Sequence, residues 1–169
     1  ECVDCHRTVI CDRWTGEYKT SNPASGLPKS LQIKIYNYYG YMDAIEQRKR
    51  QAHELVIDHR FPMERWGVAE EQNSSSMTDH EIEAKFQLLK KDSAGNHNLL
   101  KSRACERCIA TGKRGYPMGI QFYYEGDENW PEGCPVSGPE AERGCIGCGW
   151  YNFDLWRNAL NDFIRSKHE

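Results

Sequence analysis

The chain carries short apolar stretches separated by polar segments, a pattern typical of a domain that mixes strands and helices. The continuous apolar run Leu55-Val56-Ile57 predicts a strand buried on both faces. Pro62 ends this strand because proline has no N–H to donate to a β-ladder. Alternating apolar and polar residues at 31–36 predict a second strand, and the apolar residues at 85–89 predict a third.

Other segments have helical composition or periodicity. Residues 43–53 begin with Asp43 and end near a basic run, as the helix dipole favours. Residues 79–84 predict one helical turn, and residues 96–104 predict a helix that runs into a Cys-x-x-Cys pair. Apolar residues recur at helical spacing in residues 150–166, which predicts a C-terminal helix.

Irregular segments separate these elements. Residues 14–29 are rich in Gly, Pro, Ser and Asn, and residues 67–79 contain a Ser-rich tract that predicts an exposed loop. Residues 115–126 predict a further strand or hairpin, followed by an acidic, Gly- and Pro-rich excursion at 127–144. Together the elements predict an α+β fold that occupies residues 1–169 as a single domain.

Composition places the chain among globular proteins, since 38% of its 169 residues are apolar and 28% are charged. No apolar run approaches the roughly 20 residues that a membrane-spanning helix needs, and no signal-peptide pattern is present. The sequence therefore predicts a soluble protein with no membrane partner. The chain begins with Glu1 and not with methionine, which is compatible with a missing N-terminal domain.

Charge is distributed unevenly along the chain, whose net charge is −3. Acidic residues concentrate at 125–142, whereas basic residues outnumber acidic ones at 84–115. This asymmetry indicates either a solvated face or a phosphate-contacting surface. On the second interpretation the candidate nucleic-acid contacts are Lys101, Arg103, Arg107, Lys113 and Arg114.

The eight cysteines are grouped in a way that is typical of zinc sites. Two-residue spacing lets both sulfurs of a pair contact one tetrahedral ion, and eight thiolates fill two four-ligand sites without remainder. A disulfide framework is the alternative, but the cysteine-free stretch 12–104 is unlike a disulfide-dense scaffold. We therefore expect two structural Zn²⁺ ions and a reducing, cytoplasmic compartment. The cysteines are the pairs Cys2/Cys5, Cys105/Cys108 and Cys145/Cys148, with Cys11 and Cys134.

Two polar residues end the first predicted strand. Asp58 and His59 follow the apolar run directly, where polar groups can reach solvent or a metal ion. The alternative interpretation is a buried strand whose Asp58 caps the next turn and whose His59 is a surface residue.

The chain resembles the HNH, or ββα-metal, nucleases, especially the zinc-stabilised type found among restriction endonucleases. The segment Leu55-Val56-Ile57-Asp58-His59-Arg60-Phe61-Pro62 is similar to the family's apolar-Asp-His-x-x-Pro strand end. The segment Asn98-Leu99-Leu100-Lys101 is similar to its helical Asn-x-x-Lys, and an apolar strand lies between the two motifs. The resemblance covers residues 54–108 and implies a ββα core there, with a zinc-bearing extension over 109–169.

This resemblance implies a hydrolytic mechanism. In such nucleases one divalent ion bridges the scissile phosphate and the leaving oxygen, so its ligands are hard oxygens. Asp58 and Asn98 would bind Mg²⁺ or Mn²⁺, and His59 would take the proton from the attacking water. Lys101, one helical turn beyond Asn98, either contacts phosphate or is simply exposed. The implied protein is a type II-like restriction endonuclease, or its catalytic domain, that cuts double-stranded DNA as a homodimer in a prokaryotic cell.

Two features depart from the family pattern. The polar residue that the family has at the start of its second strand falls near Lys85, so the group that holds the loop after His59 is not identified. The spacing from His59 to Asn98 is also long, which makes the Ser-rich loop an insertion. Asn96 and His97 are rival ligands to Asn98. Residues two apart on a helix point about 200° away from each other, so Asn96 and Asn98 do not easily serve together.

The pairing of the cysteines has two interpretations. By the treble-clef logic of zinc-bearing family members, one site is formed by Cys2, Cys5, Cys105 and Cys108, and the other by Cys11, Cys134, Cys145 and Cys148. The competing arrangement joins Cys105/Cys108 to Cys145/Cys148 and leaves Cys2, Cys5, Cys11 and Cys134 together. In both arrangements the zinc ions are structural, because four thiolates leave no open position for catalysis.

Two functions from other classes remain open. The first is a non-catalytic, zinc-dependent nucleic-acid-binding module that uses the basic stretch 101–114, and it would lose nothing specific if His59 became alanine. The second is a zinc-stapled protein-interaction domain, which would have no salt-dependent affinity for DNA.

Overall fold

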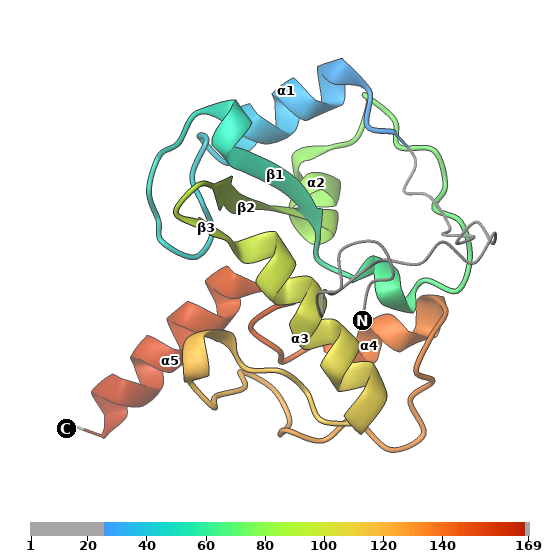
Figure 1. The fold of residues 1–169 in the computed structure, drawn as a ribbon, viewed down its shortest axis with the longest axis vertical. Helices are drawn as coiled ribbons and strands as arrows, with labels where there is room; N and C mark the ends of the chain where they lie inside the picture. The colour runs from blue at the N-terminus through green and yellow to red at the C-terminus, as the bar shows by residue number, and fades with distance from the viewer. Residues whose placement is uncertain (1–25, 168–169) are drawn as a thin grey trace, which may run out of the picture.

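The computed structural model of the chain describes residues 26–167, and its described elements form a mixed α+β fold (Figure 1). A small antiparallel sheet of three strands, ordered β1-β2-β3, lies among the helices. Its strands are β1 (Leu55–His59), β2 (Phe86–Asp92) and β3 (Gly95–Asn96). The predicted α+β class is confirmed at this level.

The helices are unevenly sized, and short 3-10 turns connect several of them. The α-helices are α1 (Lys29–Tyr38), α2 (Asp79–Lys85), α3 (His97–Thr111), α4 (Glu142–Cys145) and α5 (Phe153–Ser166). The 3-10 turns are η1 (Ala52–Glu54), η2 (Met63–Arg65), η3 (Pro117–Gly119) and η4 (Pro139–Ala141). None of the helices in the described part of the chain is long and apolar enough to cross a membrane.

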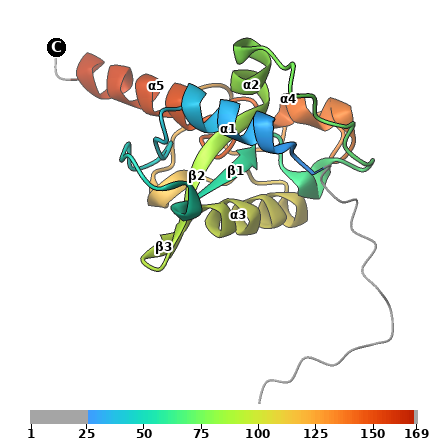
Figure 2. The same ribbon diagram turned by 90° about the horizontal axis from the view of Figure 1, so that it is seen from above.

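The strands β1 and β2 form the centre of the fold, as their apolar runs predict. Leu88 packs with α1 side chains in one apolar cluster, whereas the adjacent Leu89 packs with α5 side chains in another. This division arises because successive strand residues point to opposite faces of a sheet. Figure 1 shows the sheet between α1 and the helices α3 and α5, and Figure 2 shows α1 and α3 on opposite sides of the strands. The register pairs Asp58 with Gln87 and His59 with Phe86 at the end of β1.

The segment predicted as a strand at 31–36 is instead part of helix α1. Leu31 and Ile35, four residues apart, are fully buried, while Ile33 between them is 48% exposed. Residues at this spacing share one helix face, so both can pack on Phe86 and Leu88 of the sheet. The short alternating pattern fits a strand and a helix equally well, and contact with the sheet selects the helix.

The helix predicted at 43–53 is also wrong, since this segment is a turn that includes η1 and an isolated bridge between Met42 and Lys49. Asp43 is fully buried, and its Oδ1 accepts hydrogen bonds from the backbone N–H groups of Ile45 and Glu46. Its Oδ2 accepts from the Lys90 backbone N–H at 2.6 Å. Asp43 therefore caps a turn and ties it to β2.

The helices predicted in the second half of the chain are confirmed, although α3 is longer than predicted. Cys105 and Cys108 lie within α3, which ends where Gly112 adopts a left-handed backbone conformation with φ of 65°. Asp79 begins α2, where Thr78 and Glu81 form a capping box.

Residues 115–126 contain the 3-10 turn η3 and no strand, so the predicted strand or hairpin there is wrong. The aromatic residues of this segment contribute to core packing instead of forming a strand. Phe122 and Tyr124 pack against the apolar cluster that contains Trp156 of α5. The Trp156 indole N–H donates to the Phe122 carbonyl at 2.8 Å, which ties this irregular segment to α5.

The assignment of α1 can be tested by a matched pair of substitutions. Ile35→Ala should lower the free energy of unfolding by about 2–5 kcal/mol, because it leaves a cavity in the core. Ile33→Ala should change it by less than about 0.5 kcal/mol, because Ile33 lies on the exposed face. Urea denaturation followed by circular dichroism measures both. Equal costs for the two variants would contradict the helix.

Candidate functional site

One cavity of about 410 Å³ at the end of β1 contains the residues that the sequence singled out, and we call it the Asp58 cavity. Asp58 and His59 reach it from β1, while Asn98 and Lys101 reach it from the first turns of α3. Asp58 and His59 are consecutive in β1, so their side chains leave on opposite faces of the sheet. The Asp58 carboxylate lies with Lys101 and Gln87, whereas the His59 ring lies with Trp66 and Phe86, and both residues line the cavity. The fold thus brings together groups that lie some forty residues apart in the sequence.

Asn98 is the polar residue of the α3 N-terminus that borders this cavity. Asn96 is the N-cap of α3, and its Oδ1 accepts from the Leu99 backbone N–H at 2.9 Å. Capping explains Asn96 fully, since a side-chain oxygen at the N-cap commonly satisfies one of the free N–H groups of the first turn. Asn98, and not Asn96, lines the same cavity as Asp58.

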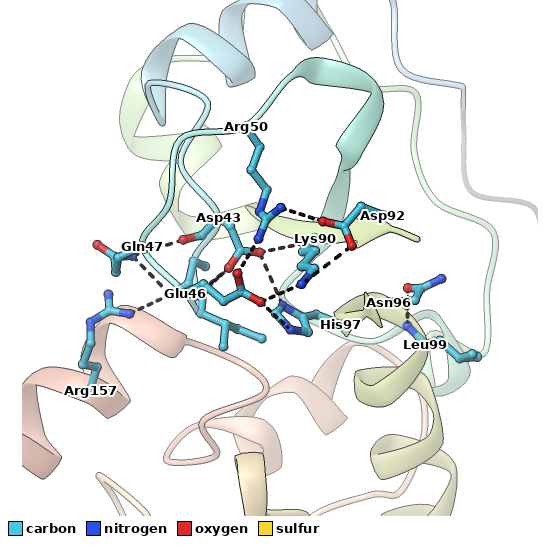
Figure 3. Close-up of polar contacts among 12 residues, drawn as sticks. Asp43, Glu46, Gln47, Arg50, Lys90, Asp92, Asn96, His97, Leu99 and Arg157 are labelled. Atoms are coloured by element: carbon cyan, nitrogen blue, oxygen red, sulfur yellow. Dashed lines mark hydrogen bonds and ion pairs between the residues drawn. The ribbon is translucent and has the colours of Figure 1, made fainter. Parts of the chain in front are cut away.

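His97 belongs to a separate, partly buried network of charged residues (Figure 3). Its two ring nitrogens lie 3.5 Å from Asp43 Oδ2 and 3.5 Å from Glu46 Oε1. Glu46 also pairs with Lys90 at 2.8 Å and with Arg50, which bonds Asp92 at 2.6 Å. The residues of this network come from the 43–50 turn, from β2 and from the first residue of α3. The network connects the start of α3 to the sheet, although the buried His97 Nδ1 has no hydrogen-bond partner among the described residues.

Lys101 is buried, with 2% of its surface exposed, and it holds the end of β1. Its Nζ lies 2.5 Å from Asp58 Oδ2, and Gln87 donates to the same oxygen at 3.0 Å. The Lys101 ammonium also donates to the carbonyl oxygens of His59 and Arg60. An ammonium has three N–H donors, and here each has an acceptor. Lys101 is therefore a structural group that holds the loop after His59.

His59 lies in a largely apolar setting with one carboxylate. Its ring lies edge-on to Trp66, with centroids 4.9 Å apart, and it also touches the Phe86 ring. Its Nε2 is 2.8 Å from Glu70 Oε1. Burial lowers the pKa of His59 below its ordinary value of 6.5, and the neighbouring Glu70 carboxylate partly opposes this shift. His59 is accordingly neutral around pH 7.

Glu70 is a site residue that sequence reasoning missed. Its side chain is 5% exposed, and Lys85 Nζ lies 2.6 Å from its Oε1. Burial raises the pKa of Glu70, but hydrogen bonds from Lys85, Asn73 and His59 outweigh that effect and lower it to about 2. Residues 67–79 were predicted as an exposed loop, and no local pattern distinguishes Glu70 from the neighbouring Glu71. Lys85, at the end of α2 beside β2, thus acts on His59 through Glu70.

A second, much smaller cavity of about 20 Å³ is lined by the thiols of Cys105, Cys108, Cys145 and Cys148. Arg65 also lines it and donates to Cys108 Sγ at 3.0 Å. Burial raises the pKa of Cys105, Cys145 and Cys148 above the ordinary thiol value. The turn between Cys145 and Cys148 requires Gly147, whose φ is 98° and whose Cβ, if present, would lie 1.9 Å from the Glu125 carbonyl oxygen.

The four thiols have the right chemistry for zinc, but within residues 26–167 no group of three or more His, Cys, Asp or Glu side chains is arranged to hold a metal ion. Cys134 lies apart from the four-cysteine cavity and contacts the Glu140 carbonyl through its Sγ at 3.8 Å. Cys2, Cys5 and Cys11 lie outside the described residues. The described part of the chain brings together Cys105/Cys108 and Cys145/Cys148, which is the competing arrangement and not the treble-clef pairing.

The predicted nucleic-acid contacts divide into buried and exposed residues. Lys101 and Arg114 are buried, and Arg114 donates to the carbonyls of Glu125, Asp127 and Ile146, so neither can reach a phosphate. Lys113 is exposed and forms an ion pair with Glu128 at 2.6 Å. Arg103 and Arg107 are exposed on α3. The prediction fails for Lys101 and Arg114 because their charges have internal partners.

Lys101→Met tests the structural role of this lysine. It should lower the free energy of unfolding by about 3 kcal/mol or more, because it removes the cationic partner of the largely shielded Asp58 carboxylate and the ammonium donor of the His59 and Arg60 carbonyls. Lys91→Met, at an exposed position of β2, is the matched control and should cost less than about 0.5 kcal/mol. Chemical denaturation measures both. A Lys101 variant as stable as the control would refute the role.

Comparison with known proteins identifies no relative of this chain. No protein-family model matches the chain, and neither a curated protein nor a solved structure matches it. The functional conclusion therefore depends on the residues of the Asp58 cavity and their chemistry.

Proposed function

We propose that the chain is a metal-dependent DNA endonuclease of the HNH, or ββα-metal, type, which hydrolyses phosphodiester bonds. The observation that carries the proposal is that Asp58, His59 and Asn98 all border one cavity. The chain order β1, β2, α3 agrees with the core that the resemblance implies. The carboxylate of Asp58 and the amide of Asn98 offer hard oxygen ligands for a metal ion, and the neutral imidazole of His59 is a base.

His59 is the general base in this proposal. A neutral imidazole can remove the proton from a water molecule as that water attacks phosphorus. The lowered pKa of His59 keeps the ring unprotonated at neutral pH, which is the state a base needs. Lys101 donates to the His59 and Arg60 carbonyls, so the end of β1 that carries the imidazole is held at its backbone.

Asp58 and Asn98 would hold Mg²⁺ or Mn²⁺. When bound, such an ion stabilises the negative charge on the scissile phosphate and the leaving oxygen. Carboxylate and amide oxygens fit this class of ion. Asp58 Oδ2 already accepts from Lys101 and Gln87, so the ion would use the other carboxylate oxygen or would displace one of these donors.

We further propose that Cys105, Cys108, Cys145 and Cys148 hold one structural Zn²⁺. Four thiolates match the zinc ligand set, and the Arg65 guanidinium beside Cys108 would offset their negative charge. This assignment leaves Cys2, Cys5, Cys11 and Cys134 for the second predicted ion. The four-cysteine cavity shares Lys101 with the Asp58 cavity, so metal binding there would stiffen the helix that also carries Asn98.

Double-stranded DNA is the proposed substrate, and a restriction-type homodimer is the proposed assembly, since one such site per chain cuts one strand at a time. The binding-module alternative loses support, because two of its five candidate basic residues, Lys101 and Arg114, are buried. Arg103 and Arg107 remain as the exposed cations of α3 for phosphate contact.

Cleavage of plasmid and mixed-sequence linear DNA tests the proposal. Wild-type protein should cut with Mg²⁺ or Mn²⁺ and not with chelator. His59→Ala should slow cutting by about 10²- to 10⁴-fold, because general-base catalysis contributes this much.

The matched control for this experiment is His80→Ala, which removes an exposed histidine and should cut like the wild type. Equal cutting by the His59 variant would refute the site. Salt-sensitive DNA binding without cutting, across substrates of varied sequence, would favour the binding module.

Zinc content tests the cysteine pairing. Cys105→Ser and Cys145→Ser should each remove about one zinc ion per chain, and the double variant should remove no more than either single one, because all four thiols serve the same ion. Elemental analysis of purified protein measures this. Additive losses, about two ions in the double variant, would instead support the pairing that assigns Cys105 and Cys145 to different sites.

A further inference from the structure

The hydrogen bond between His59 and Glu70 points to a positioning role for Glu70, and this role rests on the proposed function. The two side chains come from β1 and from the irregular segment after η2. His59 Nε2 and Glu70 Oε1 are 2.8 Å apart, and both side chains are largely shielded from water, at 10% and 5% exposed.

Glu70 is itself held in place by two other residues. Lys85 Nζ lies 2.6 Å from Glu70 Oε1 and also donates to Asn73 Oδ1 at 2.6 Å. Asn73 is 4% exposed and donates a further hydrogen bond to the Glu70 carboxylate. A carboxylate fixed by an ammonium and an amide has little freedom to turn, so it presents its oxygen to His59 in one geometry.

The protonation states follow from these contacts. The donors around Glu70 keep it ionised at neutral pH, since they lower its pKa to about 2. An ionised carboxylate only accepts hydrogen bonds, so the proton between Glu70 and His59 belongs to Nε2. A neutral imidazole carries one proton, which leaves Nδ1 as the nitrogen with a free lone pair.

The position of the ring connects this arrangement to the Asp58 cavity. His59 borders two cavities, one of about 590 Å³ on the side of Glu70 and Lys85, and the Asp58 cavity itself. Glu70 occupies the Nε2 edge of the ring, so Nδ1 is the ring nitrogen that this hydrogen bond leaves available.

We infer that Glu70, anchored by Lys85 and Asn73, is the positioning residue that holds His59 in its Nε2–H tautomer and so makes Nδ1 the basic nitrogen that serves the Asp58 cavity. In the reaction, Nδ1 takes the proton of the attacking water, and the imidazolium formed keeps its Nε2–H bond to Glu70. No covalent intermediate is needed, and the proton later leaves to solvent.

The tautomer of His59 can be measured without DNA. Nitrogen-15 NMR of histidine-labelled protein distinguishes protonated from bare ring nitrogens, and comparison with His59→Gln identifies the His59 signals among the six histidines. Wild-type protein should have Nε2 protonated and Nδ1 bare at neutral pH. A wild-type His59 with its proton on Nδ1 would overturn the inference.

Three variants test the role of Glu70. Glu70→Ala should give a mixture of tautomers and should slow DNA cleavage by roughly 10- to 100-fold with unchanged DNA affinity. Glu70→Gln keeps an oxygen acceptor facing Lys85 and should retain the tautomer and most of the turnover. Glu132→Gln, at an exposed position that is not among the residues lining either cavity, is the charge-matched control and should leave both unchanged.

The outcomes separate this inference from the proposed function. An unchanged tautomer in folded Glu70→Ala, verified by thermal unfolding, would overturn the role of Glu70 whatever the cleavage assay gives. An Nε2–H tautomer that is lost in Glu70→Ala supports it even if the wild type proves unable to cut DNA, in which case the proposed function alone fails.

Discussion

The buried ammonium of Lys101 is the constraint on which the site depends. A charge withdrawn from water costs several kcal/mol unless its donors are paired, so the helix that carries Lys101 must lie where acceptors converge. Those acceptors are Asp58 Oδ2 and the carbonyl oxygens of His59 and Arg60, all at the end of β1. This side chain thereby ties α3 to the end of β1, and Asn98 and Asp58 line the same cavity.

Other buried charged side chains also have hydrogen-bond or ion-pair partners within the protein. Glu70 is held by Lys85 and Asn73, and Asp43 is held by backbone N–H groups of its own turn and of β2. Arg65, which stacks on the Trp130 ring at 3.7 Å, donates to the Val136 carbonyl and to Cys108. Charged groups fixed before a substrate arrives need little rearrangement during a reaction, as the proposed hydrolysis would require.

Sequence reasoning succeeded where a signal is local and failed where a partner is distant. The apolar run of β1, the strand after Lys85 and the C-terminal helix were predicted from residue type and periodicity alone. Residues 31–36 were misassigned because six residues cannot distinguish alternation from helical spacing when the buried positions are Leu31 and Ile35. Asp43 resembles a helix cap in sequence, but it caps a turn because Lys90 supplies an N–H group from another element.

The sequence by itself determined the α+β class and the end of β1 with Asp58 and His59, because these depend on residue type and on residues close together in the chain. The candidate role of Asn98 comes from the resemblance to the HNH nucleases and stays a prediction. Only the tertiary structure decided that Lys101 is buried against Asp58, that Glu70 reaches His59, and that Cys105/Cys108 lie with Cys145/Cys148. These contacts join residues distant in sequence, and the cost of burying unpaired charge, which no local pattern records, selects them.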